Sequence, residues 1–70
     1  MLVVVRFDED WSNPKFVDLM KFRSCAEKSV DAFNNKNKRI DEYYNYKIYK
    51  NIWSSEKQFI REYNEGTIKR

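Results

Sequence analysis

The segment from Ile40 to Trp53, IDEYYNYKIYKNIW, constrains the fold more than any other part of the chain. Its fourteen residues hold four tyrosines, three isoleucines, two lysines and one tryptophan. Aromatic and β-branched residues favour extended backbone, and successive side chains of a strand point to opposite faces of a sheet. We therefore expect a strand that buries one face. Two alternatives stay open: a turn near Asn45 that divides the segment into a hairpin, and a helix, because apolar or aromatic residues also recur every four positions (Ile40, Tyr44, Ile48, Ile52).

Two earlier segments predict the first strand and the first helix. Leu2 to Phe7, LVVVRF, is a β-branched run that ends at an acidic cluster, so we expect a strand with both faces covered at the centre of a sheet. Pro14 follows residues that cap helices well, and the apolar side chains after it fall in one sector at 100° per residue. We expect a helix that begins at Pro14 and ends in the polar run 34–39, with these apolar positions: Phe16, Leu19, Met20, Phe22, Ala26, Val30 and Phe33.

The C-terminal part of the chain predicts a second helix. Ser55 and Gln58 have the spacing of a capping box, and Gly66, the one glycine, suits the position just past a helix. Residues 67–70 are expected to form a frayed tail. The predicted fold class is α+β: a small two-layer single domain over residues 1–70, in the order β-α-β(-β)-α, with the helices on one face of a two- or three-stranded sheet. A crossover helix would make the first two strands parallel if they pair directly.

The composition places the chain among small folded proteins. It has 70 residues, of which 41% are hydrophobic, 17% aromatic and 36% charged, so it is too rich in aromatic residues for a disordered chain. The longest apolar run, residues 2–5, is far shorter than the roughly 20 residues of a membrane span. No small-residue cleavage site follows that run. We therefore expect no signal peptide, no membrane contact and a cytoplasmic location.

Residues suited to catalysis or to metal binding are scarce. The chain has no histidine, and its single cysteine, Cys25, has no sequence neighbour that could act as its base. The acidic cluster 8–10 resembles the start of a calcium loop, but Asn13 stands where a glycine should turn the chain and Leu19 where a glutamate should bind the ion. One glycine cannot build a glycine-rich phosphate loop. The expectation is a protein that is not an enzyme and holds no metal or cofactor.

The aromatic and charged residues then point to binding. Tyrosine, tryptophan and arginine are enriched where protein interfaces derive most of their energy. We expect a contact surface with an aromatic centre, two flanking lysines and the acidic loop: Tyr43, Tyr49, Trp53, Lys47, Lys50, Asp8, Glu9 and Asp10. Such a protein would act by occluding a larger protein.

A nucleic-acid module is the alternative hypothesis. Residues 35–70 carry nine basic and five acidic groups, and lysines could neutralise phosphates while tyrosines stack on unpaired bases. This surface would consist of Lys36, Lys38, Arg39, Tyr44 and Tyr46. A third interpretation is that the rings only cover a thin sheet. The free edge of a short sheet also leaves homodimerisation open.

The residue usage also bears on the source of the chain. Lys, Asn, Ile, Phe and Tyr, whose codons are rich in A and T, supply 31 of the 70 residues. In composition the chain is similar to the short reading frames of AT-rich bacteriophages. This similarity implies a partner among the host's proteins, in a defence, restriction, transcription or toxin system, and a location in the host cytoplasm.

Overall fold

The strand β1 (Leu2–Phe7) lies at the centre of the structure, a computed structural model that describes residues 1–68. It pairs on one side with β2 (Lys15–Met20) and on the other with β3 (Asn45–Lys50), both antiparallel, so the strand order is β2-β1-β3. Val3, Val4, Val5 and Phe7 are fully buried. The central strand with two covered faces, predicted from LVVVRF, is confirmed, as is the α+β class with a three-stranded sheet.

Residues 15–20 form the strand β2 and not the start of a helix, so the predicted helix at Pro14 is wrong. A tight loop returns the chain along β1, because Trp11 and Asn13 both adopt a positive φ, of 63° and 53°. Within the loop the Asp8 N–H donates to the Ser12 carbonyl. The segment KFVDLM could place its apolar side chains on one side of a helix. Pairing with β1 satisfies its backbone hydrogen-bonding groups equally well, and this tertiary contact overrides the local helix preference.

The first helix, α1 (Arg23–Arg39), begins nine residues later than predicted and continues through the run 34–39 that was expected to end it. Its sheet-facing positions recur at helical spacing: Ala26, Val30, Phe33 and Asn37. Ala26 and Asn37 are buried, and the other two are half-buried. Basic residues in the last turn are favourable at the negative end of the helix dipole. The helix ends where Asp41 adopts a φ of 56°.

β3 (Asn45–Lys50) is a single strand of six residues, so the helical and hairpin alternatives for residues 40–53 are both wrong. It runs antiparallel to β1, against the expected parallel pairing. The reason is the additional strand β2, which brings the chain back to the start of β1 before α1 crosses the sheet. The crossover therefore joins β2 and β3, which run in the same direction on either side of β1.

The second helix, α2 (Glu56–Asn64), confirms Ser55 as the N-cap, but the reciprocal bond of the predicted capping box goes to Ser54 and not to the Ser55 N–H. The Gln58 N–H donates to Ser55 Oγ, while Gln58 Oε1 accepts from the N–H and the hydroxyl of Ser54. Gly66 adopts a φ of 82° past the helix end, and the Thr67 N–H donates to the Glu62 carbonyl. Residue 68 is half-buried against the core, and residues 69–70 of the expected tail lie outside the described residues.

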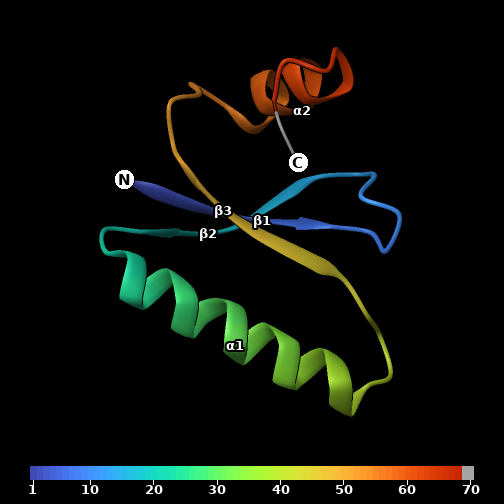
Figure 1. Ribbon diagram of the computed structural model, residues 1–70. Coiled ribbons are helices and arrows are strands. Elements are labelled where there is room, and N and C mark those ends of the chain that lie inside the picture. The colour runs from blue at the N-terminus through green and yellow to red at the C-terminus, as the bar shows by residue number, and fades with distance from the viewer. Residues whose placement is uncertain (69–70) are drawn as a thin grey trace.

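The two helices lie on opposite faces of the sheet, α1 below it and α2 above it in the view of Figure 1. The expectation that both pack on one face is wrong. Val3, Val5 and Phe7 form one cluster with Phe59 of α2, whereas Val4, which alternates with them, lies on the α1 face. Because β1 is apolar on both faces, one helix layer would leave half of it in water.

Phe59 is the residue of α2 on which this layer depends, and its truncation tests the arrangement. Phe59→Leu should lower the free energy of unfolding by about 1–2 kcal/mol, and Phe59→Ala by about 3–5 kcal/mol. The larger loss is comparable to the whole stability of a small domain, roughly 0.05–0.15 kcal/mol per residue. Urea unfolding followed by circular dichroism measures both. Phe22→Leu, at a ring that is 64% exposed, is the control, and an equal loss there would contradict the assignment of the core.

Candidate protein-binding surfaces

Two of the three rings of the predicted aromatic centre pack against α2. The Trp53 ring meets the Phe59 ring edge to face with centroids 4.7 Å apart, and the Tyr49 ring meets Phe59 in the same way at 5.4 Å. Tyr49 and Trp53 also contact each other at 6.0 Å. Burial raises the pKa of the Tyr49 hydroxyl above its ordinary value, and the neighbouring Tyr63 adds to this effect. Both rings are half-buried members of the layer between sheet and helix.

The third ring and the acidic loop lie together at the far end of β3. Tyr43 is 56% exposed and precedes β3 by two residues. The Asn45 side chain donates to the carbonyls of Asp8 and Glu9, which fastens the loop of the β1–β2 hairpin to the start of β3. This end of the sheet therefore combines an exposed tyrosine with the carboxylates of residues 8–10.

The two lysines of the predicted surface lie further along β3. Lys47 Nζ lies 5.8 Å from the Tyr49 ring centroid, on the α2 face. Lys50 is exposed at the opposite end of the strand. The structure thus distributes the predicted partner-binding residues over both ends of the sheet and the α2 layer.

The tyrosines of the nucleic-acid alternative have partners within the chain. Tyr46 stacks on Phe33 of α1 with centroids 5.6 Å apart and an angle of 10° between the rings, and its hydroxyl accepts from Asn37 Nδ2. The guanidinium of Arg6 lies 4.4 Å from the Tyr44 ring centroid. The negative charge of Glu42 raises the pKa of Tyr44, and the charge of Arg6 opposes that shift.

The cations of that alternative are exposed but stand apart from these rings. Lys36, Lys38 and Arg39 occupy the last turn of α1, where all three side chains face solvent. A hollow of about 430 Å³ lies beside Asn35, Lys38 and Arg39. Among the described residues Tyr44 contacts Arg6 and Glu42, and Tyr46 contacts Phe33 and Asn37, so these rings do not interleave with the three cations in a basic surface.

Sequence reasoning missed a different surface, which we call the apolar end. In this antiparallel sheet the start of β1, the end of β2 and the end of β3 meet at one end, and the N–H of Asn51 donates to the carbonyl of Met1 there. Of the six large hydrophobic side chains that are exposed in the described part of the chain, four belong to this end. They are Met1 (64% exposed), Leu19 (51%), Phe22 (64%) and Ile52 (72%).

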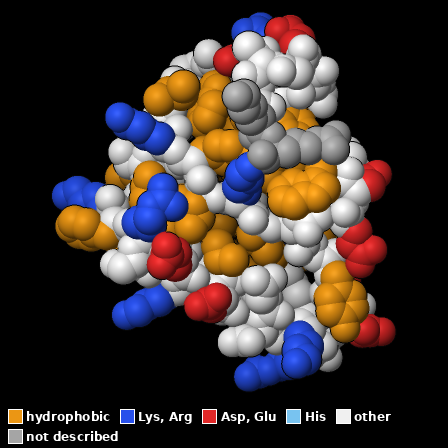
Figure 2. All heavy atoms as spheres, in the orientation of Figure 1, with side chains coloured by type: hydrophobic (Ala, Val, Ile, Leu, Met, Phe, Trp, Pro, Cys, Tyr) orange, Lys and Arg blue, Asp and Glu red, His pale blue; other side chains and the backbone are white. Residues whose placement is uncertain are grey.

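Cations are close neighbours of these apolar residues in the sequence. Lys21 and Arg23 flank Phe22, and Lys50 precedes Ile52 by two residues; all three are exposed. In Figure 2 blue and orange side chains occupy the left rim of the molecule, over the N-terminus and the start of α1, while the right rim carries red ones. The apolar end is therefore basic, whereas the hairpin loop at the other end is acidic.

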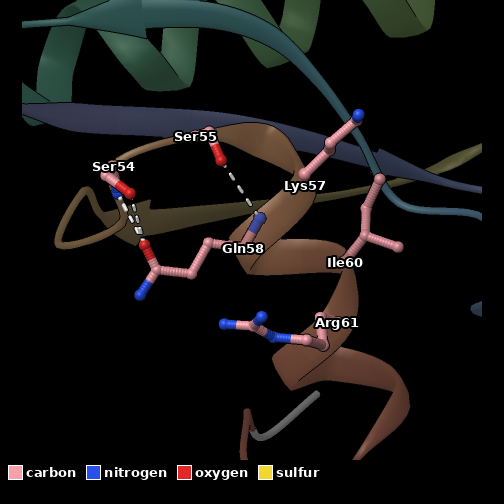
Figure 3. A pocket seen from close by; sticks show the side chains of 6 residues that line it. All are labelled: Ser54, Ser55, Lys57, Gln58, Ile60 and Arg61. Atoms are coloured by element: carbon pink, nitrogen blue, oxygen red, sulfur yellow. Dashed lines mark hydrogen bonds between the residues drawn. The ribbon is translucent and has the colours of Figure 1, made fainter.

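A hollow of about 530 Å³ lies beside the first turn of α2 (Figure 3). Its polar groups are engaged in capping the helix, since Ser55 accepts from the Gln58 N–H and Ser54 bonds to the Gln58 side chain. Lys57, Ile60 and Arg61 complete its lining. Within residues 1–68 no three acidic or cysteine side chains stand close enough to hold a metal ion, and no helix there is long and apolar enough to cross a membrane.

Comparison with known proteins adds no relative: no family model matches the chain, and no curated protein or solved structure matches it either.

The raised pKa of Tyr49 predicts a loss of stability in alkali. The pKa of this hydroxyl is higher in the folded chain than the value of about 10 in the unfolded chain. Its contribution to the free energy of unfolding is therefore complete below pH about 10 and is lost as the pH rises through the folded-state pKa. Urea midpoints measured from pH 8 to 11 should fall less steeply for Tyr49→Phe than for the wild type. Tyr43→Phe, at an exposed ring, is the matched control. Parallel curves for all three proteins would contradict the prediction.

The bond between Asn37 and Tyr46 should behave as a buried pair. Asn37 is only 8% exposed, so Tyr46→Phe leaves a buried amide without its partner and should cost about 1–3 kcal/mol of unfolding free energy. Combining Tyr46→Phe with Asn37→Leu removes both polar groups, and the double variant should lose less than the sum of the two single variants. Chemical denaturation of the four proteins measures this coupling, and strict additivity would show that the bond is not formed.

Proposed function

We propose that this chain is a non-enzymatic binding protein that attaches stoichiometrically to another protein through its apolar end. The observation that carries the proposal is the concentration of exposed apolar side chains at one end of the sheet: Met1, Leu19, Phe22 and Ile52. Several large apolar side chains left exposed at one end of a small domain commonly mark an interaction site.

The charges at this end specify the chemistry of the partner. Lys21, Arg23 and Lys50 are exposed sequence neighbours of the apolar side chains, so the complementary surface is an apolar depression with a rim of carboxylates. Opposite charges at such a rim direct the encounter and exclude wrong partners, while the apolar contacts supply affinity. The acidic hairpin loop lies at the far end and does not oppose this contact.

The partner is proposed to be a host protein, and the effect inhibition or redirection by occlusion. The support for this part is the usage of residues with AT-rich codons, which is similar to that of bacteriophage reading frames. Nucleic acid is retained as the competing target, although the engagement of Tyr46 by Phe33 and of Tyr44 by Arg6 removes support from it.

Site-specific photocrosslinking tests the proposed surface. A benzophenone amino acid replaces Phe22 in one protein and Ile40, which is 55% exposed outside this end, in the other. After irradiation in lysate of the source host, we expect the probe at position 22 to yield one dominant adduct of defined mass that persists after nuclease treatment. The probe at position 40 should yield little of it.

Charge reversal provides the second arm of this experiment. Lys21→Glu together with Arg23→Glu should reduce the adduct at position 22 by at least tenfold, because about 1.4 kcal/mol already corresponds to a factor of ten. Lys36→Glu with Lys38→Glu is the matched control with the same change in net charge. Equal crosslinking from positions 22 and 40, or an adduct that nuclease abolishes, would overturn the proposal.

A further inference from the structure

The two edges of the sheet differ in how their backbone groups are used. Within residues 1–68, β2 and β3 each pair with β1 alone, so each presents one outer row of N–H and C=O groups. Such a row is a template for another strand unless the protein blocks it. The apolar end proposed above lies at the end of the strands, so it leaves most of both rows of backbone groups uncovered.

The β2 edge is blocked by side chains of the chain itself. The Phe16 N–H donates to Glu56 Oε2 at 2.9 Å, and the Leu19 N–H donates to Asp18 Oδ1 at 2.9 Å. The register of β2 against β1 also shifts between Val4 and Val5, which marks a bulge that interrupts the edge. No straight strand can add to β2 while these contacts hold.

The β3 edge is open. The Asn51 N–H donates to the Met1 carbonyl, directly opposite in the register of β1 and β3, so this is a hydrogen-bonded pair and such pairs alternate along the ladder. The backbone groups of Tyr46, Ile48 and Lys50 therefore point outward. Among residues 1–68 no side chain bonds to the N–H groups of these three residues. The register of β3 against β1 has no bulge, so the row of outward groups is regular.

A second copy of this chain fits that edge in one register. We propose that the protein forms a twofold dimer in which the β3 strands pair antiparallel, with Ile48 opposite Ile48 of the other copy. With a twofold axis perpendicular to the sheet, the α1 faces of the two copies lie on the same side of the joined sheet. An even-numbered residue therefore opposes an even-numbered one, and an odd-numbered residue an odd-numbered one. Tyr46 then opposes Lys50, and the outward N–H groups of both copies form six hydrogen bonds.

Other registers are less favourable. An axis at Lys47 places Lys47 opposite Lys47 of the other copy, which is a like-charge pair. An axis at Tyr49 places Tyr46 opposite residue 52, which lies beyond the end of β3, so the outward groups of Tyr46 lose their partners. With the axis at Ile48, Lys47 opposes Tyr49 of the other copy, which extends a contact that Lys47 already makes within its own chain. Lysines on an edge strand discourage pairing when they oppose each other. In this register Lys47 opposes the Tyr49 ring and Lys50 opposes the Tyr46 ring.

The groove beside β3 also suits a second copy better than an unrelated peptide. It has a volume of about 390 Å³ between α1 and β3, with Val30, Tyr46 and Ile48 as its apolar lining. Its charged residues are two cations and two anions (Arg23, Lys47, Glu27, Asp31). A rim with equal numbers of both charges is complementary to itself, whereas a strongly charged peptide would meet two like charges.

Sedimentation equilibrium of the purified full chain tests the dimer. We expect the mass to rise from 8.6 kDa toward twice that value with increasing concentration. Lys50→Pro removes one outward N–H without disturbing the bonds to β1 and should weaken the dimer at least tenfold, while Lys50→Ala, which keeps the N–H, should not. A chain that stays monomeric up to about 1 mM, at the weak end of specific association, overturns the proposal, and so does equal dimerisation of the two variants.

Disulfide trapping tests the register. In a Cys25→Ser background, Ile48→Cys places two thiols on the axis, where opposite Cα atoms are about 5.5 Å apart and within disulfide reach. Lys50→Cys places them about 13 Å apart, at roughly 3.3 Å per residue. Mild oxidation should give a covalent dimer with Ile48→Cys only. Circular dichroism confirms folding of each variant, and trapping through position 50 would contradict the register. Because purified protein is used, failure here leaves the apolar-end proposal unaffected.

Discussion

The burial of β1 on both faces is the constraint on which the rest of the structure depends. Val3, Val5 and Phe7 face α2, and Val4 faces α1, each without solvent exposure. At about 25 cal/mol per Å² of apolar surface, leaving one face in water would remove a large part of the stability available to so small a chain. The chain therefore needs a helix on each face and a strand on each side, and these are the elements that the described residues, 1–68, supply around β1.

Local signals in the sequence predicted the elements that depend on few neighbours. The cap at Ser55, the stop at Gly66 and the central strand are each decided within several residues. The helix expected from Pro14 failed because its apolar spacing is compatible with either a helix face or a half-buried strand. The hairpin was decided by positive φ angles at Trp11 and Asn13, and a tryptophan rarely adopts such a conformation. Once β2 existed, the direction of β3 and the position of α1 followed.

The candidate surface was harder to predict than the fold, for a related reason. The density of rings in residues 40–53 correctly marked a strand, but a thin sheet with few aliphatic residues uses those rings as core, as Tyr46 does with Phe33 and Tyr49 with Phe59. The apolar end, in contrast, gathers side chains from positions 1, 19, 22 and 52. No window of the sequence contains them together, and only the antiparallel order of the strands brings them to one end.

The two proposed surfaces meet at two residues. The side chain of Lys50 belongs to the apolar end and its backbone to the open edge of β3, while Arg23 flanks Phe22 and also lines the groove beside β3. In the proposed dimer the twofold axis directs the two apolar ends in opposite directions, so one dimer can hold two partners without contact between them. A partner confined to Met1, Leu19 and Phe22 would bind each copy independently of dimerisation. A partner that extends over Lys50 would contact the same strand end as the second copy, and each association would then weaken the other by the same factor, because such coupling is reciprocal.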